Sequence, residues 1–139
     1  MRVFADTSGL FALLVRDDCM HVRARENFTF FARNRTALLT SSFVLVETIA
    51  LLQRRVGLAA VHSLQSRILP LLEILWVDDR WYARALQRQF ATNSRDISLV
   101  DCLSFEIMES KDIRCAFTFD RHFTENGFEI AAFHDLDAR

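Results

Sequence analysis

Short runs of apolar residues alternate along the chain with longer stretches in which apolar residues recur every three or four positions. The short runs have the length of strands and cover residues 2–5, 36–39, 72–77, 114–119 and 128–132. The longer stretches have the period of amphipathic helices and cover residues 10 onward, 19–32, 42–55, 59–69, 78–90 and 98–110. Because strands and helices alternate, the sequence predicts an α/β fold, with three α/β/α layers around a central, mainly parallel sheet.

Residues that cap or end helices support these boundaries. Hydroxyl and carboxylate side chains stand at the expected helix starts, in Asp6-Thr7-Ser8, Thr40-Ser41-Ser42, Asp78-Asp79 and Ser98. Gly57 interrupts the third predicted helix and Pro70 ends the fourth. With three glycines, one proline and no repeat, nothing marks an internal boundary, so residues 1–139 are predicted to form a single domain.

The amino-acid composition indicates the size of the hydrophobic core and the cellular compartment of the protein. Hydrophobic residues make up 51% of the chain, which is ample for one independently folding domain. The three cysteines, Cys19, Cys102 and Cys115, are scattered and follow no metal-binding spacing, as in a reducing compartment. The longest apolar stretch near the start, Leu10 to Val15, is too short to span a bilayer, and no signal pattern precedes it. We therefore expect a cytoplasmic protein without membrane contact.

Charge is distributed unevenly between the two halves of the chain. Residues 1–70 carry a net charge of +4 and residues 71–139 a net charge of −5, and Lys111 is the only lysine. Arginine suits bidentate contacts with phosphate better than lysine does. The arginines that could line a phosphate-tracking surface are Arg23, Arg25, Arg33, Arg35, Arg54 and Arg55. A solvated helix face with ion pairs is the alternative, and charge alone favours it.

Four acidic residues stand in apolar surroundings, where a carboxylate loses hydration on folding. Asp6 and Asp120 each end a predicted strand, whereas Glu47 and Asp101 lie within predicted helices. In open parallel sheets, ligands bind beyond the carboxyl ends of the strands, so one pocket there can collect all four. Taken singly, each residue also has an ordinary structural explanation as a helix cap, a first-turn acid, a turn former or a half-exposed helix residue.

A cluster of carboxylates needs a cation. Oxygen ligands suit Mg²⁺ or Mn²⁺, and only His122, next to Asp120, offers a nearby nitrogen. Such an ion can activate water and neutralise the charge of a phosphodiester, which is the chemistry of many nucleases.

Neighbouring polar residues can support this cluster. Ser8 and Thr118 are candidates to hydrogen-bond either a metal-bound water or a ligating carboxylate. Asp96 is either a fifth acid or, in the interpretation we favour, the cap of the helix that starts near Ser98. Arg121 and His122 can hold a phosphate, although Arg121 can equally pair with the surplus negative charge. We do not expect His122 to act as a general base.

Four local motifs occur in a consistent order along the chain. They are Phe4-Ala5-Asp6-Thr7-Ser8-Gly9, Val46-Glu47-Thr48, the segment from Ser98 to Phe105 and the segment from Ala116 to Phe123. No fragment is specific alone, but the ordered set resembles the PIN-domain ribonucleases, including the VapC-type toxins. The resemblance spans residues 1–132 and implies one nuclease domain.

The resemblance also implies a site and an activity. Asp6, Glu47, Asp101 and Asp120 would take the family's acidic metal-site positions, with Mg²⁺ or Mn²⁺ as cofactor. The expected reaction is endonucleolytic cleavage of RNA by the toxin of a toxin–antitoxin pair. Family members commonly form homodimers and pair with a small antitoxin, so both are expected partners.

Other functions remain open at this stage. A phospho-receiver domain shares the expected fold and an acidic Mg²⁺ pocket, but it needs a lysine at the end of a late strand, and Lys111 falls in a predicted helix. A haloacid-dehalogenase-type phosphatase needs an aspartate two residues after Asp6, where this chain has Ser8. A PIN fold that binds RNA or protein without turnover is the remaining alternative.

Overall fold

The computed structural model describes residues 1–133, and its centre is one parallel sheet. The sheet has five strands in the order β3-β2-β1-β4-β5, and every neighbouring pair is parallel. The strands are β1 (Arg2–Ala5), β2 (Ala37–Ser41), β3 (Leu72–Leu75), β4 (Cys115–Phe117) and β5 (Glu129–Ile130). The order changes direction at β1, so the carboxyl ends of β1 and its neighbour β4 lie where a ligand site is expected.

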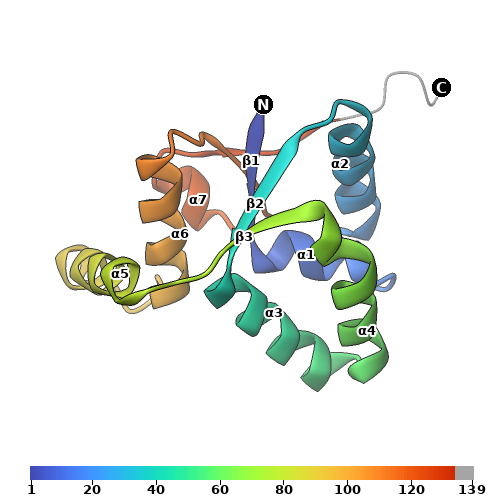
Figure 1. Cartoon of the computed structure of the whole chain (residues 1–139), viewed down its shortest axis with the longest axis horizontal. Coiled ribbons are helices and arrows are strands. Elements are labelled where there is room, and N and C mark those ends of the chain that lie inside the picture. Colours follow the sequence, from blue (N-terminus) through green and yellow to red (C-terminus); the bar gives the residue numbers. More distant parts are fainter. Residues whose placement is uncertain (134–139) are drawn as a thin grey trace.

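Helices cover both faces of this sheet. They are α1 (Thr7–Leu14), α2 (His21–Arg33), α3 (Ser42–Arg55), α4 (Leu58–Ser63), α5 (Asp79–Thr92), α6 (Leu99–Ser110) and α7 (His122–Glu125). Figure 1 shows α5, α6 and α7 on one side of the strands and α1, α2 and α4 on the other. The predicted three-layer α/β/α architecture is thus confirmed, and the sheet is parallel throughout.

Helix caps predicted from the sequence are present. Ser41, Asp78 and Ser98 each accept a hydrogen bond from a backbone N–H in the first turn of the helix that follows. The preference for Asp96 as the cap of α6 was wrong, because Ser98 holds that position and Asp96 is exposed. Gly57 has φ 122°, a left-handed conformation that favours glycine, and it separates α3 from α4.

Several boundaries differ from the predicted ones. The helix predicted over 59–69 is α4 followed by a π-helical turn, Leu64–Ile68, and a 3-10 turn, Leu69–Leu71, which contains Pro70. Apolar periodicity alone does not distinguish these helical forms. The strands predicted over 114–119 and 128–132 shorten to β4 and β5. Among residues 1–133, no helix is both long and apolar enough to cross a membrane.

The core lies between the sheet and the helices and is rich in phenylalanine. Phe4, Phe31, Phe105, Phe117 and Phe123 are fully buried. One close approach between layers matters for the site: a Cβ added to Gly9 would lie 2.3 Å from the carbonyl oxygen of Phe117. Only glycine therefore allows α1 to start so close to the end of β4, which brings the residues after β1 next to those after β4.

Candidate metal centre

The four predicted acids come from four segments near the carboxyl ends of the strands. Asp6 directly follows β1, and Asp120 lies three residues beyond the neighbouring strand β4. Glu47 lies in the second turn of α3, which directly follows β2, and Asp101 lies in the first turn of α6. The positions of Asp6, Glu47 and Asp120 follow from the parallel order of the sheet, because β1, β2 and β4 end at the same edge, whereas α6, which carries Asp101, follows α5.

Asp6 is held by two hydroxyl groups. Thr118 Oγ1 donates to Asp6 Oδ2 at 2.9 Å, and Ser8 Oγ donates to the same oxygen at 3.2 Å. Backbone N–H groups fix both hydroxyls, because Phe119 N donates to Ser8 Oγ and Asp120 N donates to Thr118 Oγ1. The predicted contact of Ser8 and Thr118 with a carboxylate of the cluster is confirmed. Although Asp6 stands at the N-cap position of α1, its side chain makes no capping hydrogen bond.

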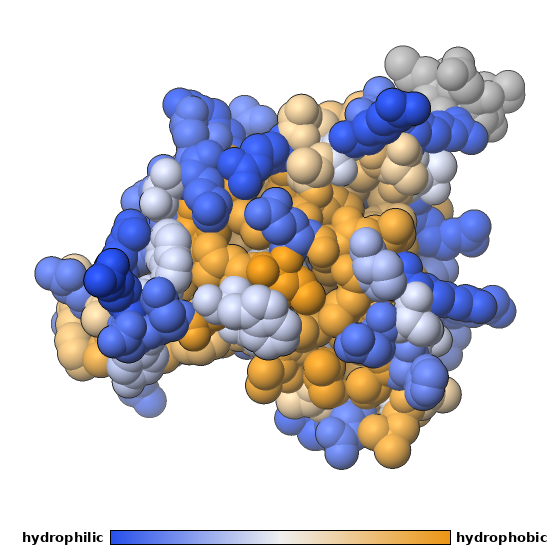
Figure 2. Space-filling view, in the orientation of Figure 1, coloured by the Kyte–Doolittle hydropathy of each residue, from blue (hydrophilic) through white to orange (hydrophobic). Residues whose placement is uncertain are grey.

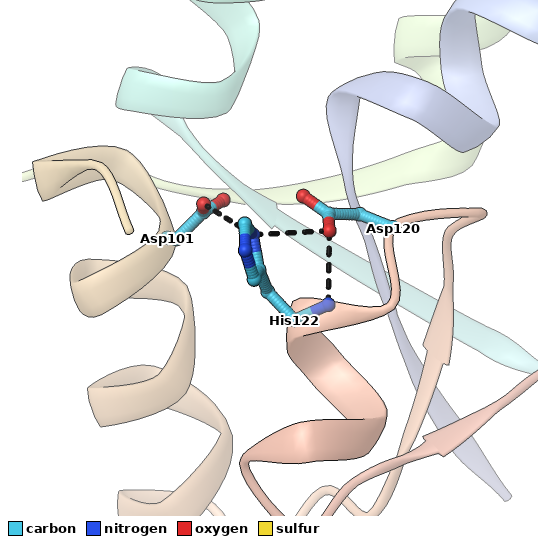
Figure 3. A group of neighbouring side chains, drawn as sticks. All are labelled: Asp101, Asp120 and His122. Carbon is cyan, nitrogen blue, oxygen red and sulfur yellow. Dashed lines mark hydrogen bonds and ion pairs between the residues drawn. The ribbon is translucent and has the colours of Figure 1, made fainter. Parts of the chain in front are cut away.

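Asp101, Asp120 and His122 form a compact group, shown in Figure 3. One potential ligand atom from each residue lies within 4.8 Å of the others. The backbone N–H of His122 donates to Asp120 Oδ1 at 2.9 Å, and the imidazole lies between the two carboxylates. His122 Nδ1 lies 3.2 Å from Asp120 Oδ1 and 3.9 Å from Asp101 Oδ2. Although Nδ1 is buried and near these oxygens, it makes no well-aligned hydrogen bond within residues 1–133.

Electrostatic coupling connects all four carboxylates. Burial, together with the charges of Asp101 and Glu47, raises the pKa of Asp6 to about 7, against the opposing effect of the hydrogen bond from Thr118. Burial also raises the pKa of Asp101, and the charges of Asp120 and Glu47 add to the effect. Glu47 is half-buried and acts on both aspartates through its charge. The cluster therefore carries repulsion that a cation would relieve.

No arginine or lysine within residues 1–133 forms an ion pair with any of these four acids. Arg121, which we considered as a partner for the cluster, is exposed and faces Glu125 instead, at 3.6 Å. Lys111 follows the far end of α6, so it cannot serve the acids as the lysine of a phospho-receiver does. Carboxylate oxygens with one imidazole nitrogen form a donor set that fits a divalent cation.

The sequence predicted Asp101 and Asp120 as metal ligands but did not predict His122 as one. Its position two residues after Asp120 was the available signal, because an Asx-type turn brings the backbone of residue i+2 to the aspartate. The direction of the ring, however, depends on where α7 packs, with Phe123 fully buried beside it.

A family model described as PIN domain matches residues 3–129. The chain belongs to the PIN-domain family. The 23S rRNA-specific endonuclease VapC20 of Mycobacterium tuberculosis, from strains CDC 1551 / Oshkosh and H37Rv, is 33% identical to this PIN domain over 127 residues. The match covers 91% of this chain and 95% of VapC20.

A solved structure agrees with this assignment. The crystal structure of Mycobacterium tuberculosis VapC20, described as a Sarcin-Ricin loop cleaving toxin, matches this PIN domain with a TM-score of 0.80 and 30% identity. The match covers 96% of this chain and 99% of the VapC20 chain. The predicted family and α/β fold are therefore confirmed, and the relatives are endonucleases that act on RNA, the enzyme class expected from the sequence.

Proposed function

We propose that this PIN domain is a metal-dependent endoribonuclease, the toxin of a toxin–antitoxin pair. The observation that carries the proposal is the electrostatic coupling of Asp6, Glu47, Asp101 and Asp120, which have no arginine or lysine partner in residues 1–133. A protein tolerates such repulsion where a ligand compensates it. Similarity to VapC20 over most of the chain supports RNA as the substrate, and 23S rRNA is the first RNA to test.

Mg²⁺ or Mn²⁺ is the proposed cofactor. The four acids would hold the cation, and the buried His122 Nδ1, which has no aligned hydrogen bond within residues 1–133, is available as a nitrogen ligand. A divalent cation bound there supplies a Lewis acid that activates water and neutralises charge on the phosphodiester. The charged carboxylates are needed for binding, so the raised pKa of Asp6 makes cation affinity increase as the pH rises through about 7.

The remaining residues of the site position these ligands. Thr118 and Ser8 hold Asp6 in one orientation, and the Ser98 cap orders the turn of α6 that carries Asp101. The amino-terminal end of α6 also favours the ionised form of Asp101 through the helix dipole. Such supporting hydrogen bonds fix ligand geometry before the cation arrives.

The proposal includes two protein partners, a small antitoxin and a second copy of the chain. The second copy is supported by the face seen in Figure 2, where a broad apolar area covers the region of β2 and β3. The edge strand β3 is flanked by Leu71 and Trp76, whose exposed fractions are 59% and 70%. Trp76→Glu is expected to shift the mass measured by light scattering from dimer to monomer, and an unchanged mass would exclude this face.

The activity is tested by incubating purified protein with total RNA and intact ribosomes in Mg²⁺, Mn²⁺ or EDTA. Cleavage is expected only with metal, and Asp6→Asn or Asp101→Asn should lower its rate by about 100-fold or more, because several kcal/mol of stabilisation are lost. Asp112→Asn is the matched control: Asp112 is an exposed aspartate beyond the far end of α6, and its φ of 53° suits asparagine.

Two outcomes would contradict the proposal. Cleavage that survives both site substitutions would assign the activity to another site or a contaminant. A folded protein that binds RNA but cuts none of it with either metal would favour the alternative, a PIN-fold binding module without turnover.

A further inference from the structure

An open pocket lies at the carboxyl-terminal end of α1, whereas the acid cluster lies at its amino-terminal end. The end of α1, the start of α2, α4 and the π-helical turn surround it, and its volume is about 490 Å³. Its polar lining consists of Arg16, His21, Arg25, Ser63 and Arg67. We call these five residues the arginine pocket. Three arginines in one small pocket give it a strong local positive charge.

Local structure directs these side chains into the pocket. His21 and Arg25 are four residues apart on α2, and Ser63 and Arg67 are four residues apart where α4 continues into the π-helical turn. Residues at this spacing lie on one face of a helix. His21 Nδ1 lies 2.8 Å from the carbonyl oxygen of Ala12, which can only accept, so the ring donates there and is anchored to α1. The pocket wall is thus fixed, and the arginine ends are exposed.

The pocket arginines are not ion-paired within residues 1–133. None of Arg16, Arg25 and Arg67 forms an ion pair with a carboxylate in the described part of the chain. Arg25 is the pocket residue that belongs to the arginines proposed from the sequence as a phosphate-tracking surface, and the alternative of ion pairing does not apply to it within residues 1–133.

The position of the pocket relates it to the acid cluster. α1 starts next to Asp6 and ends at Leu14, so its eight residues separate the two places by about 12 Å. Arg55, at the end of α3, extends the basic surface toward α1, since its guanidinium lies 5.7 Å from the centre of the Phe11 ring. α1 itself has no exposed residue, so the path between the two places runs over the neighbouring surface. A separation of about 12 Å is short enough for one RNA chain to reach the arginine pocket and the acids together.

We propose that Arg16, Arg25 and Arg67 form a subsite for the phosphodiester backbone of the substrate, a few nucleotides away from the cleaved bond. This inference rests on the proposed RNA-cleaving function and adds a binding position to it. Guanidinium groups bind phosphates in a bidentate manner and fix register without reading sequence. An acidic polypeptide would satisfy the same charges, but RNA is favoured because the phosphodiester site proposed at the other end of α1 acts on the same polymer.

RNA binding in EDTA tests the subsite without cleavage. The anisotropy of a labelled single-stranded RNA of mixed sequence is measured over a series of NaCl concentrations for wild type and for the double variant Arg25→Gln/Arg67→Gln. Each lost phosphate contact lowers the slope of log affinity against log salt by about 0.7, so the double variant should lose about 1.4. Under cleaving conditions the same variant should raise KM and leave kcat unchanged.

The control variant Arg2→Gln/Arg114→Gln removes the same charge elsewhere. Both residues are exposed and precede buried parts of β1 and β4, at the edge of the sheet opposite the acids. Its salt slope should equal that of wild type. If both double variants lost the same amount of salt slope, RNA binding would depend only on the net charge of the protein, and the subsite proposal would be wrong.

The remaining outcomes separate this inference from the proposed function. If wild type binds and cuts RNA but the pocket variant has the wild-type slope and KM, the subsite is wrong and the nuclease stands. If the pocket variant loses binding to poly-glutamate and keeps RNA binding, the pocket accepts an acidic polypeptide and the subsite is again wrong. If wild type neither binds nor cuts RNA, the nuclease proposal and the subsite fail together.

Discussion

Arginines on the two sides of the sheet have different surroundings. On α5, Arg88 lies 3.3 Å from Glu106 and 3.0 Å from Glu109, and its guanidinium covers the Phe105 ring. Arg84 pairs with Glu106 at 3.0 Å and stacks on Trp81. In the arginine pocket, by contrast, no such ion pair occurs within residues 1–133. Glu106 and Glu109 of α6 thus neutralise Arg84 and Arg88, whereas the pocket arginines have no such partner within residues 1–133.

The acid cluster resembles the arginine pocket in that, among the described residues, its charges lack compensating side chains. Its carboxylates repel one another and have no arginine or lysine to compensate them in the part of the chain that is described. Uncompensated charges of opposite sign thus occur at the two ends of α1. A divalent cation would compensate the acid cluster, and an RNA backbone would compensate the arginine pocket. Measurements of stability and of binding can therefore separate charges that serve the fold from charges that serve a ligand.

The largest expected effect is a gain in stability from removing a site carboxylate. The pKa of Asp6 is about 7 in the folded protein, against the ordinary aspartate value of 3.8 that we take for the unfolded chain, so the folded state binds this proton more tightly. Raising the pH between these values therefore lowers the free energy of unfolding of the metal-free protein. At pH well above 7, Asp6→Asn should raise that free energy by up to about 4 kcal/mol, and at pH below 4 by almost nothing.

Urea unfolding in EDTA across this pH range measures the effect. Asp112→Asn, which changes an exposed aspartate, should follow wild type at every pH. A wild-type curve that stays flat through the interval would mean that the cluster is already compensated in the metal-free protein.

Local signals explain why much of this site could be predicted from the sequence. Asp6 and Asp120 follow runs of buried strand residues, and the Ser41, Asp78 and Ser98 caps depend only on their neighbours in the chain. Parallel pairing of β1 with β4 then brings Thr118 to Asp6, so the hydroxyl contact follows from topology.

Features that depend on packing between distant segments could not be predicted. The His122 ring turns to the acids only because α7 packs as it does, and Arg121, the preceding residue, points to Glu125 instead. The arginine pocket brings Arg25 and Arg67 together across more than forty positions of sequence, through a π-helical turn that periodicity does not reveal.

The next effect concerns the hydroxyl that orders Asp6. Thr118→Val keeps the shape of the side chain but removes the donor to Asp6 and the acceptor for Asp120 N. Loss of such a supporting contact typically lowers metal affinity about 10- to 100-fold. Titration of Mn²⁺ followed by electron paramagnetic resonance should show this loss. Thr124→Val, at an exposed position of α7, is the control, and equal affinities for the two variants would remove Thr118 from the site.

Between α5 and α6, where arginines and glutamates form ion pairs, removing a charge should lower the free energy of unfolding. Arg88→Met keeps an apolar stem over Phe105 but leaves Glu106 and Glu109 without this partner. We expect a loss of about 1–2 kcal/mol in the free energy of unfolding, the sum of two modest ion pairs and a cation–π contact. Arg80→Met, an exposed change on the same helix, should cost less than about 0.5 kcal/mol. Equal losses in the two variants would show that helix propensity, not pairing, sets the effect.

The smallest effect on stability is expected in the arginine pocket. It tests whether the pocket arginines, unlike Arg84 and Arg88, serve a ligand and not the fold. Arg25→Gln/Arg67→Gln removes two charges from exposed side chains without ion-pair partners in residues 1–133, so the free energy of unfolding should change by less than about 0.5 kcal/mol. If this variant is as stable as wild type but binds RNA less tightly, the surplus charge serves the ligand. A loss of stability as large as that of Arg88→Met would instead mean that both groups of arginines support the fold, because the change would then remove interactions that the folded chain itself needs.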